Sequence, residues 1–262
     1  MKVDQIGPSE APSRQEASTP PRVLVAGAGG SSGVAAIRAL DGETLDIFSA
    51  DSDPHAPGLN LVEEDRRLPV AKGYGDSYTE LLYPLCERHG IDVLVPALDC
   101  ELLLLASARA FFAEIGTRIV LPEERTLRLC LDRRALRCCC RGVVRVPDST
   151  LADQNLPGAE YSLATLARSD GKVAAVVPWA WRDSEIEASG RAVHDEGLEE
   201  IGRQIARRIG LTSLANIRMK EASDGEPVLL EVNPYFAGTM PLMPAKSVGM
   251  LKLCVDDVLA DD

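Results

Sequence analysis

Two polar side chains near the end of the chain have the types and spacing of a cation site. Glu231 and Asn233 follow an apolar run in the segment LLEVNPYF, residues 229–236. Residues two apart on a β-strand point to the same face, which would place the carboxylate beside the amide oxygen. Hard oxygen donors of this kind suit Mg²⁺, which takes few protein ligands and keeps several waters or phosphates. The alternative is a strand-end glutamate that reaches solvent, with Asn-Pro forming the next turn.

A glycine-rich turn near the start could bind a phosphate. Residues 26–33 read AGAGGSSG and precede a helix, whose free N–H groups and dipole favour an anion. Asp51 follows about twenty residues later, where dinucleotide-binding folds place a carboxylate on the ribose. Ser32, however, stands where the third glycine of GxGxxG would fall. A nucleotide site centred on Gly27, Gly29 and Asp51 and a plain strand-to-helix turn therefore remain alternatives.

The first half of the chain predicts strands that alternate with helices. A β-branched run begins at Arg22, and its glycine turn leads into a helix that opens with a serine cap at Ser31 or Ser32. Further strands are expected at 45–50, 66–71, 91–98 and 117–122, and helices at 77–89 and 101–116. This alternation indicates a parallel sheet covered on both faces, in a domain that spans residues 22–122.

The second half, residues 123–262, predicts an α+β lobe. Two short helices broken near Asp132 and an irregular strand are followed by long strands joined through short polar turns. A helix over 196–210, with Gly210 as its C-cap, separates the two strand pairs, and a closing helix begins near Leu251. The strand pairs are expected at 160–168 with 172–181, and at 214–222 with 227–234.

Composition excludes several classes of protein. The 262 residues include 28 basic and 40 acidic side chains, a net charge of −12 that repels a nucleic-acid backbone. Apolar stretches are too short to span a bilayer, and residues 1–21 predict a disordered leader without the apolar core of a secretory signal. The seven cysteines show no CxxC spacing and are interpreted as reduced structural thiols, in keeping with a cytoplasmic location.

Together these motifs resemble the ATP-grasp superfamily, in particular the carbamoyl-phosphate synthetase large subunit and related carboxylate–amine ligases. The resemblance extends from Arg22 to the C-terminus. It implies a Rossmann-like pre-ATP-grasp domain followed by an ATP-grasp lobe that ends in a Glu-x-Asn-Pro-Arg signature. It also implies that the glycine-rich turn is structural. The reaction implied is attack of a small carboxylate on the γ-phosphate of ATP, followed by capture of the acyl phosphate by an amine.

The resemblance also implies roles for individual residues. Glu231 and Asn233 match the ligands of the Mg²⁺ (or Mn²⁺) ions that bridge the ATP phosphates. Arg133, at the start of the helix LDRRAL, matches a phosphate-contacting cation, and Glu160, in LPGAEYSL, matches a carboxylate that binds the ribose. Arg218 occupies a place where many relatives have a glutamine that assists the metals, and it could contact phosphate instead. The implied partners are small carboxylate and amine substrates, and a homodimer is compatible with the resemblance.

Three features depart from the family pattern. No lid subdomain of several dozen residues lies between Asn155 and Leu156, although relatives enclose ATP beneath one. Arg218 has no acceptor and would repel Mg²⁺. Tyr235 replaces the signature arginine, and a phenol cannot supply that cation.

Three functions therefore follow as hypotheses. The first is an ATP- and Mg²⁺-dependent ligase of a small carboxylate with an amine, with activity impaired by these departures. The second is a non-catalytic relative that acts as a binding or regulatory module. The third is an NAD(P)-binding Rossmann protein, which leaves the second half of the chain unexplained.

Overall fold

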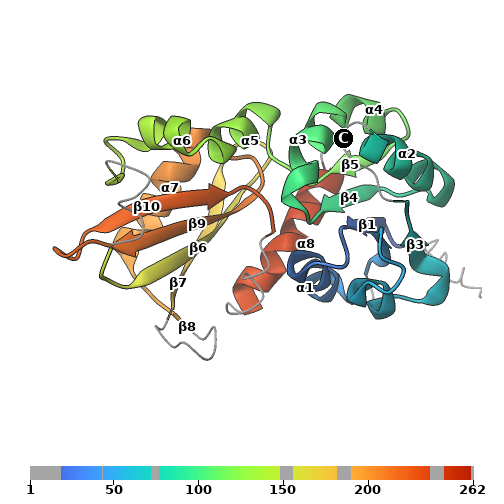
Figure 1. Ribbon diagram of the computed structural model, residues 1–262, viewed down its shortest axis with the longest axis horizontal. Helices are drawn as coiled ribbons and strands as arrows, with labels where there is room; N and C mark the ends of the chain where they lie inside the picture. Colours follow the sequence, from blue (N-terminus) through green and yellow to red (C-terminus); the bar gives the residue numbers. More distant parts are fainter. Residues whose placement is uncertain are drawn as a thin grey trace, which may run out of the picture.

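The computed structural model describes residues 19–42, 44–71, 77–147, 156–181, 190–236 and 245–260. They form two lobes, each built on its own sheet (Figure 1). The leader predicted at residues 1–21 lies outside the described residues up to position 18.

The first lobe is the predicted parallel sheet. Its strand order is β3-β2-β1-β4-β5, and every neighbouring pair is parallel. Residues 23–26 of the central strand and all of β4 are buried, because helices cover both faces. The strands are β1 (Arg22–Ala26), β2 (Asp46–Asp51), β3 (Arg67–Pro69), β4 (Val93–Pro96) and β5 (Arg118–Ile119). The helices are α1 (Ser31–Leu40), α2 (Ser77–His89), α3 (Leu102–Ser107) and α4 (Arg109–Ala113), with short 3₁₀ turns η1 (Pro57–Leu61), η2 (Glu64–Arg66) and η3 (Asp99–Glu101).

The glycine turn between β1 and α1 is held by close backbone packing. A Cβ placed on Gly33 would lie 2.2 Å from the carbonyl oxygen of Gly27, so only glycine fits there. Helix α1 begins at Ser31, but its N-cap is Gly30, and no side chain caps it. The predicted serine cap is therefore wrong: backbone contact positions the helix start.

The single helix predicted over 101–116 is also wrong. The chain forms η3, α3 and α4 in succession, with a break at Ala108. Arg109 follows this break, and its guanidinium donates to the carbonyls of Ile119 (2.9 Å) and Leu121 (2.7 Å). These bonds tie α4 to the end of the sheet, where β5 has only two residues.

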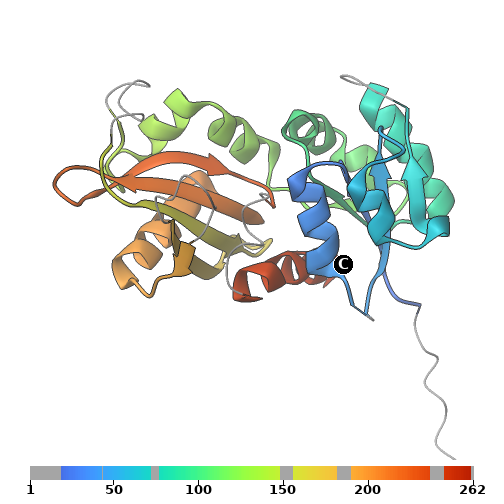
Figure 2. The same cartoon turned by 60° about the horizontal axis from the view of Figure 1, so that its bottom comes forward.

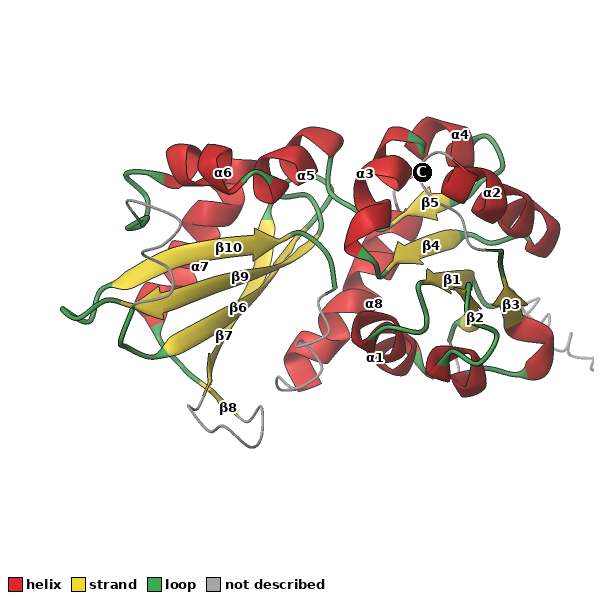
Figure 3. Ribbon diagram, viewed as in Figure 1, coloured by secondary structure: helices red, strands yellow, loops and turns green. Residues whose placement is uncertain are grey.

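The second lobe is an antiparallel sheet with the order β10-β9-β6-β7-β8. Helices α5, α6 and α7 all pack on the same face of this sheet (Figures 1 and 3). Strand β8 was not expected from the sequence. The strands are β6 (Glu160–Ala167), β7 (Val173–Trp181), β8 (Gly190–Ala192), β9 (Leu214–Glu221) and β10 (Pro227–Asn233). The helices are α5 (Glu124–Leu131), α6 (Arg133–Cys140) and α7 (Glu196–Ile209).

The C-terminal helix α8 (Ala245–Ala260) joins the two lobes. It begins before the predicted Leu251 and packs beside α1 of the first lobe (Figure 2). Leu251 and Val255 are fully buried in a core that contains residues of both sheets. Arg118 of β5 donates to the carbonyl of Val258 at 3.0 Å. A helix from the end of the sequence thus completes the packing of the N-terminal lobe.

None of the helices in the described part of the chain has the length and apolarity needed to cross a bilayer.

Candidate functional site

The charged residues singled out from the sequence meet on one face of the antiparallel sheet. Four elements supply them: the first residue of α6, the first residue of β6, the middle of β9 and the end of β10. We call this set the ion-pair cluster; its members are Arg133, Glu160, Arg218, Glu231 and Asn233.

Strand periodicity and one bulge turn the strand residues of the cluster away from the helical layer. On β10, Leu229 and Val232 are both buried against the helical layer, although they are three residues apart. A register shift between Leu229 and Glu231 permits this, and it brings Glu231 directly opposite Arg218 of β9. Asn233 follows two residues later on the same face, as the sequence predicted.

Arg218 lies at the centre of the cluster, between two carboxylates. Its Nη1 donates to Oε1 of Glu231 at 2.8 Å, and its Nε donates to Oε1 of Glu160 at 3.1 Å. Nη2 of Arg218 donates to the same Glu160 oxygen. Arg133 donates from Nη2 to Oε2 of Glu231 at 3.0 Å, and Asn233 Nδ2 donates to Oε1 at 3.2 Å. The result is a chain of alternating charge, Glu160–Arg218–Glu231–Arg133.

The two arginines make Glu231 more acidic than an ordinary glutamate. Burial by itself would raise the pKa of Glu231, whose side chain is 20% exposed. Hydrogen bonds from Arg218 and Asn233, with the charges of Arg218 and Arg133, outweigh burial and hold its pKa below the ordinary 4.5. With two carboxylates and two guanidinium groups, the cluster carries no net charge at neutral pH.

The start of α6 positions Arg133. Asp132 ends α5 and caps α6, since its Oδ1 accepts hydrogen bonds from the backbone N–H groups of Arg134 (2.9 Å) and Ala135 (3.0 Å). This confirms the predicted break near Asp132 and gives it a cause. The cap fixes the first turn from which Arg133 reaches Glu231.

A further acidic residue, Glu221, supports the turn before Glu160 and was not singled out from the sequence. Its Oε1 accepts a hydrogen bond from the Tyr161 hydroxyl at 2.6 Å, and its Oε2 accepts one from the Ala159 N–H at 3.2 Å. A Cβ on Gly158 would lie 2.4 Å from the Glu221 Cβ, which explains the glycine in LPGAEYSL. Burial and the hydrogen bond to Glu221 raise the pKa of Tyr161 to about 12.

Tyr235, which stands in place of the signature arginine, links the two lobes. Its phenol interacts with the carboxylate of Asp99, which follows β4 in the first lobe. Burial and the neighbouring carboxylate of Asp99 raise the pKa of Tyr235. Asp99 was missed, although its place just beyond the carboxyl end of a buried strand was a usable signal.

The donor set does not fit Mg²⁺ in this arrangement. Both oxygens of Glu231 accept hydrogen bonds from arginines, and the guanidinium of Arg218 lies 2.8 Å from one of them. In the part of the chain that the structure describes, no three His, Cys, Asp or Glu side chains are grouped as metal ligands. A cation with donors only repels a divalent ion and cannot ligate it.

The glycine turn and Asp51 are brought together, but for a structural purpose. Asp51 Oδ2 accepts a hydrogen bond from the Gly29 N–H at 2.6 Å, and its Oδ1 accepts one from the Asp53 N–H at 2.9 Å. A Cβ on Gly58 would lie 2.2 Å from the Ala28 carbonyl oxygen, so η1 packs directly on the turn. Both oxygens of the carboxylate are thus used within the protein, which disfavours a ribose contact.

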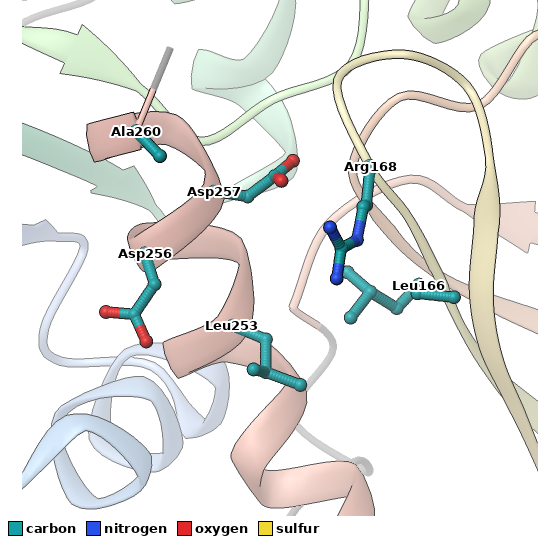
Figure 4. A pocket seen from close by; sticks show the side chains of 7 residues that line it. Leu166, Arg168, Leu253, Asp256, Asp257 and Ala260 are labelled. Carbon is teal, nitrogen blue, oxygen red and sulfur yellow. The ribbon is translucent and has the colours of Figure 1, made fainter.

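A cavity of about 250 Å³ lies at the far end of β6, between α8 and the β6–β7 hairpin. Figure 4 shows Arg168 and Asp257 directed toward this space, with Leu166 and Leu253 beside them. Asp257 Oδ2 accepts a hydrogen bond from the Ser169 N–H at 2.8 Å, which ties α8 to the hairpin. No residue of the ion-pair cluster lines this cavity.

The class defined by these observations is a two-lobed α/β protein, with a Rossmann-like parallel lobe and an antiparallel lobe that carries a charged cluster. Residues 147–262 match the family described as "ATP-grasp in the biosynthetic pathway with Ter operon". Residues 23–120 match the family described as "PylC-like, N-terminal domain". The first of these matches, over somewhat less than half of the chain, confirms the resemblance to the ATP-grasp superfamily that the sequence predicted.

Solved structures share this fold at low sequence identity. A multifunctional pyruvate carboxylase from Rhizobium etli matches with a TM-score of 0.71 and 14% identity over 93% of this chain and 28% of its own. A biotin carboxylase complex with β,γ-ATP from Campylobacter jejuni gives 0.69 and 10%, over 92% of this chain and 71% of its own. An L-amino acid ligase from Bacillus licheniformis gives 0.63 and 12%, over 92% and 74%. The chain therefore spans little more than a quarter of the pyruvate carboxylase.

No curated protein matches the sequence at a significant level.

Proposed function

We propose that the ion-pair cluster is a nucleotide site and that this protein binds ATP there. The observation that carries the proposal is convergence: five residues from four separate elements meet on one sheet face within hydrogen-bond distance of one another. Arg133 and Arg218 supply cations for phosphate oxygens, and Glu160 supplies a carboxylate for ribose hydroxyls. The match of residues 147–262 to an ATP-grasp family supports the same assignment.

The geometry favours binding over turnover. Phosphoryl transfer depends on positioning, on charge neutralisation and on exclusion of water. Only eight residues separate Pro147 from Leu156, which is too few for a lid subdomain that would cover the nucleotide. Tyr235 is engaged with Asp99 and contributes no cation. We therefore propose a nucleotide-binding module of the ATP-grasp type.

A ligase is the second candidate, and the placement of Glu231 beside Asn233 favours it. In that function a substrate carboxylate oxygen bonds to the γ-phosphorus and ADP leaves. An amine nitrogen then attacks the acyl carbon, and phosphate and a proton are released. Glu231 and Asn233 would hold Mg²⁺ (or Mn²⁺), for which Arg218 must first leave Glu231. The substrates would be a small carboxylate and an amine.

Two measurements separate these candidates. Isothermal titration calorimetry with ATP tests the nucleotide site, with Glu160→Gln expected to weaken binding through loss of the ribose contact. Hydroxylamine trapping tests turnover, because acyl phosphates form stable hydroxamates; a panel of carboxylates, amino acids included, would be supplied with ATP and Mg²⁺. Binding without hydroxamate supports the module, binding with hydroxamate supports the ligase, and absence of binding refutes both.

We also propose a reducing, cytoplasmic location. All seven cysteines are unpaired, and burial raises the pKa of four of their thiols to about 12. A homodimer stays a prediction, which sedimentation equilibrium would test.

A further inference from the structure

The position of Arg218 in the sheet holds its side chain between Glu160 and Glu231. It lies in the middle of β9, directly opposite Glu231 on β10 and opposite Ser162 on β6. Both flanking strands are hydrogen-bonded to β9, so the backbone of Arg218 cannot move aside. Its side chain is 37% exposed and its guanidinium spans from Glu231 to Glu160.

This guanidinium provides the positive charge that a metal would bring to Glu231. It neutralises the carboxylate from one side, while Arg133 does so from the other at 3.0 Å. A divalent ion on Glu231 would have to displace the guanidinium of Arg218. Because the backbone of Arg218 is held in β9, the displaced guanidinium would stay close to the ion. Since the side chains are partly buried, solvent screening of that repulsion is incomplete.

An arginine also offers what a phosphate needs. Guanidinium groups donate paired N–H bonds to phosphate oxygens, and these charge-assisted bonds are stronger than neutral ones. Arg218 and Arg133 approach the same carboxylate from two elements, so their charges converge near one point. An incoming phosphate would exchange with the Glu231 carboxylate for the same donors.

We propose that Arg218, together with Arg133, replaces the divalent metal, so that this protein binds the phosphates of ATP or ADP without Mg²⁺. The inference rests on the proposed nucleotide site and specifies its ligand: the metal-free nucleotide. Mg²⁺ weakens binding for two reasons. It lowers the negative charge of the nucleotide, and it brings a cation toward Arg218.

The test is calorimetric titration of the full chain with ATP, once in excess EDTA and once in excess Mg²⁺. Binding in EDTA should be tighter than in Mg²⁺, by about ten-fold if the charge of the nucleotide dominates. Arg218→Gln should abolish the metal-free binding or make binding depend on Mg²⁺. Arg218→Lys keeps the charge and should retain metal-free binding at reduced affinity.

Arg168→Gln is the matched control. Arg168 is exposed at the far end of β6, outside the ion-pair cluster, and its substitution should leave both titrations unchanged. Circular dichroism would establish that Arg218→Gln is folded, and thermal unfolding with ADP in EDTA gives a second readout for all three variants.

The outcomes distinguish the two proposals. Binding that requires Mg²⁺ in the unaltered protein overturns metal replacement and leaves the nucleotide site standing. Binding to neither form overturns the nucleotide site itself. Metal-free binding that survives Arg218→Gln also overturns the inference, because the arginine would then not be its cause.

Discussion

Substitution of Arg218 should lower the free energy of unfolding, and the partial burial of its ion pairs determines the size of the loss. Arg218→Met keeps the length of the side chain and removes both ion pairs, to Glu160 and to Glu231. Breaking a buried pair costs about 3–5 kcal/mol, whereas an exposed pair contributes about 0–1 kcal/mol. The three side chains are 20–37% exposed, which places the expected loss between these limits. We expect about 2 kcal/mol at pH 7, or a decrease in Tm of about 4–8 °C for a chain of this size.

The loss of stability on Arg218→Met should also depend on pH and should become smaller in acid. The pKa of Glu231 is lowered in the folded protein, so its ion pairs contribute stability above the ordinary pKa of 4.5. That contribution is lost as the pH falls through the lowered, folded-state pKa. The difference in Tm between the unaltered protein and Arg218→Met should therefore be full at pH 7 and should shrink below about pH 4.5.

Thermal and urea unfolding across pH 3–8 would measure both effects, with Arg168→Met as the control at an exposed arginine outside the cluster. In the Glu160→Gln, Glu231→Gln background, Arg218→Met should cost little, since the partner charges are already gone. A loss below about 0.5 kcal/mol at pH 7, the range of ordinary surface substitutions, would refute the reasoning. A loss that is the same at pH 3 and pH 7 would refute the assignment to ion pairs.

Three further changes test other parts of the structure. Burial raises the pKa of Glu101, whose Oε1 accepts a hydrogen bond from the Ala97 N–H at 2.8 Å. The folded state therefore favours the protonated acid, and the protein loses stability as the pH rises above the pKa of Glu101 in the unfolded chain. Glu101→Gln stays neutral, and its gain in Tm over the unaltered protein should therefore grow between pH 4 and pH 8; a gain independent of pH would contradict this. Gly33→Ala forces a Cβ to within 2.2 Å of a carbonyl oxygen and should cost about 2–4 kcal/mol in urea unfolding, whereas Gly249→Ala in α8 meets nothing within 4 Å and should be neutral or stabilising. Equal effects of the two alanines would show that close packing is not the reason for Gly33. Tyr235→Phe removes the hydroxyl that interacts with the Asp99 carboxylate of the other lobe and should lower the free energy of unfolding by about 1 kcal/mol; an unchanged Tm would argue against that interaction.

Local sequence signals predicted many elements because their causes are local. Helix α2 spans 77–89 as expected, and α7 ends at Ile209 before Gly210 as predicted. Asp132 was recognised as a break between two helices, and its side chain caps the second. These features depend on apolar periodicity, caps and turn residues that lie within a few positions of one another.

The sequence singled out the residues of the ion-pair cluster, but not their contacts with one another. The shared face of Glu231 and Asn233 follows from the two-residue period of a strand. The bulge after Leu229, which brings Glu231 opposite Arg218, depends on packing against three helices and leaves no signature in the sequence. The contact of Arg218 with both carboxylates follows from that register.

Long-range packing overrode the sequence in three places. The start of α1 is held by the approach of Gly33 to Gly27 and has no serine cap. The helix predicted over 101–116 breaks at Ala108, next to Arg109, which donates to carbonyls in β5 and just after it. Helix α8 packs on the first lobe from the opposite end of the chain.

Composition, periodicity and motif spacing were sufficient for the two-lobed α/β architecture, the ATP-grasp resemblance and the identity of the charged residues, because each is encoded over short stretches of chain. The pairing of Arg218 with Glu160 and Glu231 joins residues 58 and 13 positions apart, and Tyr235 interacts with Asp99 of the other lobe. Such contacts exist only after sheets and helices have packed. The tertiary structure alone therefore decided that Glu160 and Glu231 are neutralised by the protein's own arginines.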